Sequence, residues 1–221
     1  MVMQHLYLIP MLVSAILSLK AFRLSWPVAY KIFSIFLFTA LFTEILGNLW
    51  HYYLHSFNGW HYTKNNAWIY SASFIPQYGL LMFVYHQALD STIMKRLVIW
   101  AVVLFSLFAI FNFCFWQKAF VINSYTHILA DVIMLSLVFA YFEQVRKEKG
   151  LVKLSAQPMV WISLGVLIFH LLSIPYLLSI EFLYQNFRSL ATSFIYVYLL
   201  FIFSSYVLYS KTFLCPTPRP K

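Results

Sequence analysis

Seven long apolar stretches divide the chain and constrain its fold more than any other feature. They run over approximately residues 5–22, 28–54, 68–88, 97–116, 121–143, 158–180 and 189–210. A helix needs about 20 mostly apolar residues to cross the hydrocarbon core of a bilayer. Only 10% of the residues are charged, whereas a soluble domain has about 25%. The pattern predicts an all-α polytopic membrane protein and argues against a soluble enzyme or a nucleic-acid-binding protein.

The connections between these stretches are too short to fold separately. The longest, around residues 56–67, has about a dozen residues. We therefore expect one transmembrane domain, a seven-helix bundle, followed by a short cytosolic tail at 211–221. The first stretch has no Lys or Arg before it, which is the wrong order for a signal peptide, so we expect it to remain as a helix. Without a catalytic or signalling module, any output to the cytosol requires a cytosolic or membrane signalling partner.

Lys and Arg are concentrated in alternate connections. Of the 15 cations, only Lys64, Lys118 and Arg188 lie in the second, fourth and sixth connections; the others lie in the first, third and fifth connections and in the tail. Cytoplasmic loops carry an excess of Lys and Arg. This asymmetry predicts an amino terminus outside and a carboxyl terminus in the cytosol. It also explains the net charge of +9 by topology and contact with membrane lipids, with no nucleic-acid partner.

Polar side chains inside the apolar stretches identify a candidate site. Two of the six acidic residues, Glu44 and Asp131, lie near the middle of a stretch. A carboxylate there costs about 2.5–3.5 kcal/mol on insertion scales, so such groups usually face the bundle interior. Asn48 and His51 follow Glu44 on one helical face, and His127 precedes Asp131 by one turn. The other deep polar residues are Gln77, Asn112 and His170.

The depths of these residues predict a pocket that opens outward. Glu44, Gln77, Asp131 and His170 lie near the midplane, counted at 1.5 Å per residue, and the remaining polar groups lie nearer the outer side. We expect a binding site made of Glu44, Asn48, His51, Gln77, Asn112, His127, Asp131 and His170, with Glu181 and Arg188 at its mouth. Tyr70, Tyr78, Trp161, Tyr176, Tyr196 and Tyr198 are aromatic residues that can line it.

Three functions fit such a pocket. The first is a receptor-like sensor or accessory subunit that binds a small molecule or lipid head group. The second is an intramembrane hydrolase with zinc on His51, His127, Asp131 and His170, which are ligand types that zinc accepts. The third is a small-solute or proton-coupled transporter in which Glu44 and Asp131 titrate. The sequence assigns no catalytic residue and no certain cofactor, and residues 189–210 contain no Lys to hold a covalent retinal.

A purely structural role is the alternative for each polar residue. Polar contacts between membrane helices contribute about 0.6 kcal/mol on average, which can hold a bundle together without any chemistry. For a single Asn or Gln we favour this interpretation. For Glu44 and Asp131 we favour function, because two buried carboxylates without a buried Lys or Arg must be protonated, paired with His or bound to a cation.

Two segments carry a resemblance to a known group of proteins. The segment Asn65-Asn66-Ala67-Trp68-Ile69-Tyr70, with the run that follows it to Leu89, and the tail Leu214-Cys215-Pro216 resemble uncharacterised seven-helix bacterial inner-membrane proteins. The resemblance concerns layout and implies no activity. It implies a bacterial inner membrane as the location of the protein.

Overall fold

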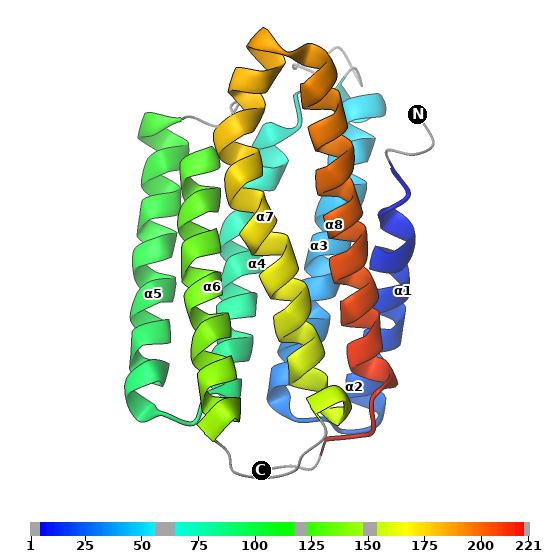
Figure 1. Ribbon diagram of the computed structural model, residues 1–221, viewed down its shortest axis with the longest axis vertical. Coiled ribbons are helices and arrows are strands. Elements are labelled where there is room, and N and C mark those ends of the chain that lie inside the picture. The colour runs from blue at the N-terminus through cyan, green and yellow to red at the C-terminus, as the bar shows by residue number, and fades with distance from the viewer. Residues whose placement is uncertain (1–4, 56–64, 118–122, 148–153, 219–221) are drawn as a thin grey trace.

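The computed structural model describes residues 5–55, 65–117, 123–147 and 154–218, and every regular element in these ranges is a helix (Figure 1). The helices are α1 (Leu8–Ser18), α2 (Lys20–Arg23), α3 (Val28–Tyr52), α4 (Ala67–Ala88), α5 (Thr92–Phe111), α6 (Ser124–Lys147), α7 (Pro158–Asn186) and α8 (Arg188–Leu214). A π-helical turn, η3 (Asn112–Trp116), continues α5, and a 3₁₀ turn, η4 (Leu154–Ala156), precedes α7. The predicted all-α class is confirmed.

The helix boundaries correct the predicted stretches at several places. Leu19, between α1 and α2, has helical backbone angles (φ −59°, ψ −22°), so these two segments form one nearly continuous rod. The last two helices are longer than predicted, since α7 continues to Asn186 and α8 to Leu214. The predicted tail therefore begins within α8. An apolar stretch marks contact with lipid, whereas a helix can continue into water for as long as its backbone hydrogen bonds do.

Five of the helices are long and apolar enough to cross a membrane. They are α3, α5 with η3, α6, α7 and α8. Helix α1 by itself has only 11 residues, and α4 has the length but carries Ser, Gln, His and Pro residues. The protein is therefore an integral membrane protein by the length and composition of these five helices. The two helices that fall short still pack within the same bundle (Figure 1).

Consecutive long helices run antiparallel, so the described chain starts and finishes at opposite ends of the bundle (Figure 1). We call these the N-terminal end and the C-terminal end. Helix α1 packs against both α3 and α8, which brings the first and last helices side by side. Further contacts join α3 to α4, α4 to α5 and α6, and α7 to α6 and α8.

Aromatic rings are packed in the interior at the C-terminal end of the bundle. At the C-terminal end, Trp26, Phe33 and Phe213 are fully buried, and the Lys20 Nζ donates to the carbonyl oxygen of Phe213 at 2.9 Å. The ring of Phe213 on α8 packs against Trp26 and against Phe33 of α3. The outer surface of the bundle is apolar, with large side chains such as Phe115 72% exposed. An apolar exterior around a partly polar interior is the arrangement expected in lipid.

Candidate ligand-binding site

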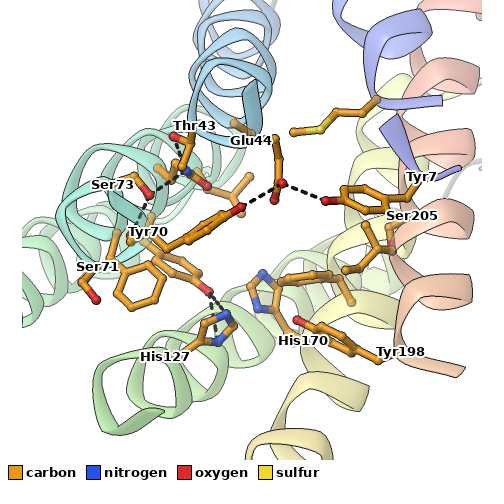
Figure 2. Close-up of a pocket in the computed structure, with 18 of the residues that line it drawn as sticks. Tyr7, Thr43, Glu44, Tyr70, Ser71, Ser73, His127, His170, Tyr198 and Ser205 are labelled. Carbon is orange, nitrogen blue, oxygen red and sulfur yellow. Dashed lines mark hydrogen bonds between the residues drawn. The ribbon is translucent and has the colours of Figure 1, made fainter. Parts of the chain in front are cut away.

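A cavity of about 490 Å³ lies inside the bundle (Figure 2). Side chains of α1, α3, α4, α6, α7 and α8 line it, together with Tyr7, which precedes α1. Along α4 the lining extends from Asn66, at the N-terminal end, to Leu81, a distance of roughly 22 Å at 1.5 Å per residue. The cavity therefore reaches from the N-terminal end into the middle of the bundle, and the packed rings of Trp26, Phe33 and Phe213 lie at the other end.

Glu44 of α3 presents its carboxylate to this cavity between two tyrosines (Figure 2). The hydroxyl groups of Tyr7 and Tyr70 donate to the same oxygen, Oε2, at 2.8 and 3.1 Å. None of the hydrogen bonds of the described residues uses the other oxygen, Oε1, and this atom is not one of the buried polar atoms that lack a partner. Oε1 therefore remains accessible from the cavity and able to accept a further hydrogen bond.

Gly47 makes this arrangement possible. A Cβ atom at this position would lie 2.7 Å from the hydroxyl oxygen of Tyr70 and 2.9 Å from its Cζ. Real Cβ atoms essentially never approach so closely, so only glycine lets the Tyr70 ring lie against α3 and reach Glu44. The Nδ2 of Asn66 donates to the carbonyl oxygen of Gly47 at 3.0 Å, which ties the beginning of α4 to the same turn of α3.

A second polar group lies beside Glu44. The Nε2 of Gln77 donates to Oγ1 of Thr43 and to Oγ of Ser73, each at 3.0 Å. Gln77 thereby joins α4 to α3 next to Pro76, which interrupts the backbone hydrogen bonding of α4.

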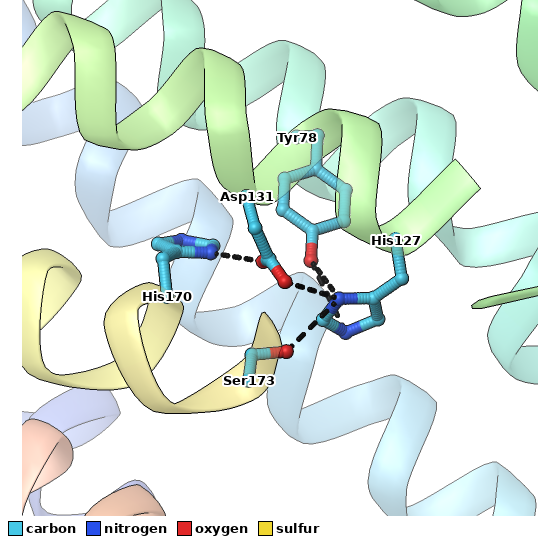
Figure 3. Close-up of polar contacts among 5 residues, drawn as sticks. All are labelled: Tyr78, His127, Asp131, His170 and Ser173. Carbon is cyan, nitrogen blue, oxygen red and sulfur yellow. Dashed lines mark hydrogen bonds and ion pairs between the residues drawn. The ribbon is translucent and has the colours of Figure 1, made fainter. Parts of the chain in front are cut away.

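Asp131 of α6 occupies a separate, closed cluster (Figure 3). Its side chain is fully buried, with Oδ1 2.6 Å from Nδ1 of His170 and Oδ2 3.2 Å from Nδ1 of His127. The same Nδ1 of His127 lies 3.2 Å from Oγ of Ser173, and the Tyr78 hydroxyl lies 3.3 Å from both ring nitrogens of His127. Both carboxylate oxygens of Asp131 are therefore occupied by side chains from α6 and α7.

The geometry of this cluster bears on hydrolytic chemistry. A Ser-His-Asp triad requires the serine and the aspartate to contact opposite nitrogens of the histidine ring. Here Ser173 and Asp131 both contact Nδ1 of His127, so the three groups do not form a relay. In the described part of the chain, no group of three or more His, Cys, Asp or Glu side chains is arranged to hold a metal ion. Neither observation supports a hydrolase.

Aromatic rings form a large part of the remaining wall. The rings of Tyr176 on α7 and Tyr198 on α8 stack with centroids 4.0 Å apart and planes 3° from parallel. Phe169 packs between Tyr198 and His127, with centroid distances of 6.1 and 6.2 Å. Seven tyrosines of the described chain contribute to the lining, so it combines aromatic faces with hydroxyl groups: Tyr7, Tyr70, Tyr78, Tyr176, Tyr198, Tyr206 and Tyr209.

The predicted binding residues divide between this cavity and other places. Glu44, Gln77, His127 and His170 line the cavity, and Asp131 lies directly behind the two histidines. Of the aromatic residues suggested from the sequence, Tyr70, Tyr78, Tyr176 and Tyr198 line it, whereas Trp161 and Tyr196 do not.

Other predicted residues lie outside the lining. Asn48 turns back to donate its Nδ2 to the carbonyl oxygen of Glu44 at 2.8 Å. His51 is exposed near the end of α3, with its ring edge-on to Tyr52. Asn112 is buried, but its Nδ2 donates to Thr126 and Gln117, so it joins the end of α5 to the start of α6. The structure thus separates His51 from the other three predicted zinc ligands.

The two residues predicted at the mouth of the pocket are also outside the lining. Glu181 and Arg188 are both exposed, near the turn between α7 and α8. The guanidinium carbon of Arg188 lies 5.6 Å from the ring centroid of Tyr184, and no described ion pair joins Arg188 to Glu181.

Several residues of the site were not predicted from the sequence. Tyr7, Tyr206 and Tyr209 lie in stretches rich in aromatic residues, where nothing distinguishes a ring in the cavity from one in lipid. Ser173 and Ser205 are serines in long helices, which commonly bond their own backbone. A helical projection that placed Tyr198, Ser205 and Tyr209 on one face of α8 would have been the available signal.

Comparison of the chain with protein-family models, with curated proteins and with solved structures finds no match in any of the three. The proposals below therefore rest on the geometry of the cavity.

Proposed function

We propose that the protein is an integral membrane receptor-like sensor or accessory subunit, whose cavity accepts a small molecule or a lipid head group. One observation carries this proposal: a cavity of about 490 Å³ reaches from one end of the bundle to its middle and contains an accessible carboxylate oxygen of Glu44. Ligand pockets commonly have about 300–1,000 Å³ and combine apolar walls with a few convergent polar groups. The cavity has this size and this composition.

The proposed topology has seven crossings, with the amino terminus outside. The antiparallel packing of the first rod and α4 among five apolar helices supports it (Figure 1). Of the nine described Lys and Arg residues, Arg188 alone lies at the N-terminal end of the bundle. By the preference of Lys and Arg for cytoplasmic loops, the C-terminal end then faces the cytosol and the cavity opens outward. We place the protein in a bacterial inner membrane, on the resemblance of the Asn65–Tyr70 segment.

A sensor fits the site better than a hydrolase does. The contacts of Ser173 and Asp131 with one nitrogen of His127 do not provide an activated nucleophile. Helix α7 carries His170 at the cavity and begins with Pro158 at the C-terminal end. A ligand that displaces α7 can therefore change the cytosolic end, where a signalling partner would detect it.

Two adjacent serines of α8 provide a direct test of the cavity. Ser205 lines it and is 1% exposed, whereas Ser204 is only partly buried and does not line it. We expect native mass spectrometry of the protein, released from nanodiscs of bacterial membrane lipid, to detect a retained small molecule or lipid. Ser205→Leu should abolish this retention and Ser204→Leu should preserve it, with both variants folded by circular dichroism. Equal retention by the two variants would contradict the proposal.

A flux measurement separates a sensor from a carrier. We expect proteoliposomes that contain the protein to show no uptake of the retained molecule above that of empty vesicles. Uptake that Asp131→Asn abolishes would make a transporter the better conclusion.

The orientation has its own test. Ser189 and Ser91 are exposed near opposite ends of the bundle, at the beginnings of α8 and α5. In a chain without its native cysteines, a membrane-impermeant maleimide added to intact cells should label Ser189→Cys and not Ser91→Cys. The reverse pattern would contradict the proposed orientation.

A further inference from the structure

We propose that the ligand of this cavity is an organic cation, with an ammonium group seated on Glu44 and an apolar body among the aromatic rings. This inference rests on the proposed function, since it names the chemical class of the molecule that the site binds. Three features of the lining support it: the accessible oxygen of Glu44, the distribution of charge and the aromatic side chains.

The accessible oxygen defines where a donor would bind. Tyr7 precedes α1 and Tyr70 lies on α4, yet both donate to Oε2 of Glu44. Their two bonds fix the carboxylate, so that Oε1 is held in the cavity without a partner among the described residues. A carboxylate oxygen accepts hydrogen bonds only, and bonds from a charged donor are shorter and stronger than neutral ones. An ammonium group supplies that donor.

The distribution of charge favours a cation over an anion. No Lys or Arg is among the described residues that line the cavity, and Glu44 is the one carboxylate there. An anion would therefore be placed beside a carboxylate without a Lys or Arg side chain to hold it, and the two histidines of the lining are already paired with Asp131, so the cost in a low-dielectric interior is large. Asp131 does not provide a second binding position for an ammonium group, because its two oxygens are occupied by His170 and His127.

The aromatic rings favour an organic cation over a metal ion. Tyrosine faces attract ammonium groups within about 6 Å of the ring centroid, and cages of such rings recognise alkylated amines. The wall includes the stacked pair of Tyr176 and Tyr198, and it gains apolar surface from Phe169, which packs against Tyr198, and from Phe74, which packs against Tyr78. A bare metal ion would need several oxygen or nitrogen ligands within bonding distance, and it would leave most of a cavity of about 490 Å³ unfilled. An amine with an apolar body would occupy more of this volume than a metal ion.

Matched probes test this inference on the full chain. The probes are 2-phenylethylamine, which is a cation at pH 7, 2-phenylethanol, which is neutral and of similar shape, and phenylacetate, which is an anion. Binding to the protein in phosphatidylglycerol nanodiscs is measured by calorimetry, and empty nanodiscs give the background. We expect the amine to bind at least about tenfold more tightly than either of the other two.

A pair of acid-to-amide variants identifies the carboxylate. Glu44→Gln keeps the size of the side chain and an oxygen for the two tyrosines, but it removes the negative charge. It should weaken binding of the amine about tenfold or more and remove the preference over 2-phenylethanol. Glu181→Gln, an exposed acid that does not line the cavity, should change neither. The comparison of the three probes on the unaltered chain needs no variant, so it tests the inference even if Glu44→Gln fails to fold.

The lipid composition of the nanodiscs distinguishes an ammonium group of a lipid from that of a free amine. Phosphatidylethanolamine carries one in its head group, whereas phosphatidylglycerol does not. If a lipid supplies the ligand, adding phosphatidylethanolamine to the nanodiscs weakens binding of the amine, and native mass spectrometry finds this lipid retained. If the ligand is a free amine, the added lipid changes nothing. Both results support an ammonium ligand.

The results that would overturn the organic cation differ from those that would also overturn the proposed function. Equal binding of 2-phenylethanol and the amine, or no effect of a folded Glu44→Gln protein, would overturn the organic cation and leave a small-molecule site in place. A third result combines the two experiments. If none of the probes binds but Ser205→Leu still abolishes retention of a molecule, the organic cation is overturned and the small-molecule site is not. Binding of none of them, together with equal retention by Ser205→Leu and Ser204→Leu, would overturn both proposals.

Discussion

Removal of Asp131 should destabilise the protein more than its two hydrogen bonds alone would suggest. In Asp131→Ala, His170, which is 2% exposed in the unaltered protein, loses its only hydrogen bond among the described residues. An unpaired buried polar group costs about 1–3 kcal/mol. His127 loses one contact but keeps Tyr78 and Ser173, so its share is nearer the average of about 0.6 kcal/mol for interhelical polar contacts. We expect a total loss of about 2–4 kcal/mol.

A double-mutant cycle isolates the bond between Asp131 and His170. Its members are Asp131→Ala, His170→Ala and the double variant, each unfolded reversibly in mixed micelles with increasing sodium dodecyl sulfate. Circular dichroism measures the helix content and tryptophan fluorescence gives a second probe. We expect a coupling energy of about 1–3 kcal/mol between Asp131 and His170, and a smaller one in the corresponding cycle with His127. The difference follows from their distances of 2.6 and 3.2 Å and from the partners that His127 keeps.

The same helix offers a matched control. Glu143 and Arg146 on α6 form an ion pair that is also 2.6 Å long, but their side chains are 46% and 75% exposed. Exposed pairs of this kind contribute about 0.3–0.5 kcal/mol, so this cycle should give a small coupling at the same distance. A loss below about 1 kcal/mol in Asp131→Ala, or equal coupling in the buried and exposed cycles, would refute the reasoning from burial.

Two further predictions concern glycines, and Gly79, where a Cβ would meet nothing within 4 Å, is the control for both. Gly47→Ala should displace Tyr70 from Glu44 and weaken binding of 2-phenylethylamine in the calorimetric assay, whereas Gly79→Ala should not. Unchanged binding by Gly47→Ala would show that the Tyr70 ring can move without loss of affinity. Gly165→Ala places a Cβ against the ring of Tyr209 where α7 and α8 meet, so it should destabilise the protein by about 1–3 kcal/mol, measured by the same unfolding titration. A stability equal to that of Gly79→Ala would contradict this close packing.

The sequence was sufficient for the fold class because the bilayer imposes one dominant requirement. Every backbone group in lipid must be paired within the chain, so long apolar stretches predict helices directly. The ends of the helices were harder to predict. Residues such as Glu181 and Asn186 are polar, yet α7 continues through them, because helix propensity and backbone hydrogen bonds persist beyond the hydrocarbon region.

The site was predicted in part, for a reason that its residues show. A buried acid is costly enough to stand out, so Glu44 and Asp131 could be selected from composition and depth. The partners of an acid carry no such signal when they are common in the chain. Tyr7 is one of 16 tyrosines, and its contact with Glu44 joins residues 37 positions apart. His51 shows the opposite error, because it shares a helical face with Glu44 but lies beyond the part of α3 that lines the cavity.

Glu44 and Asp131, the two acids that lie deep in the predicted helices, have different roles in the structure. Asp131 is fully buried and its two oxygens contact His127 and His170, so it connects α6 to α7 and orients the two histidines at the cavity. Glu44 is held through one oxygen only, which leaves the other for a ligand. A site that must recognise a small cation needs an accessible carboxylate held in place, as Tyr7 and Tyr70 hold Glu44, and a lining whose other polar groups are already paired, as Asp131 pairs the two histidines. Substitutions of Asp131 should therefore reduce stability first and binding second, whereas substitutions of Glu44 should do the reverse.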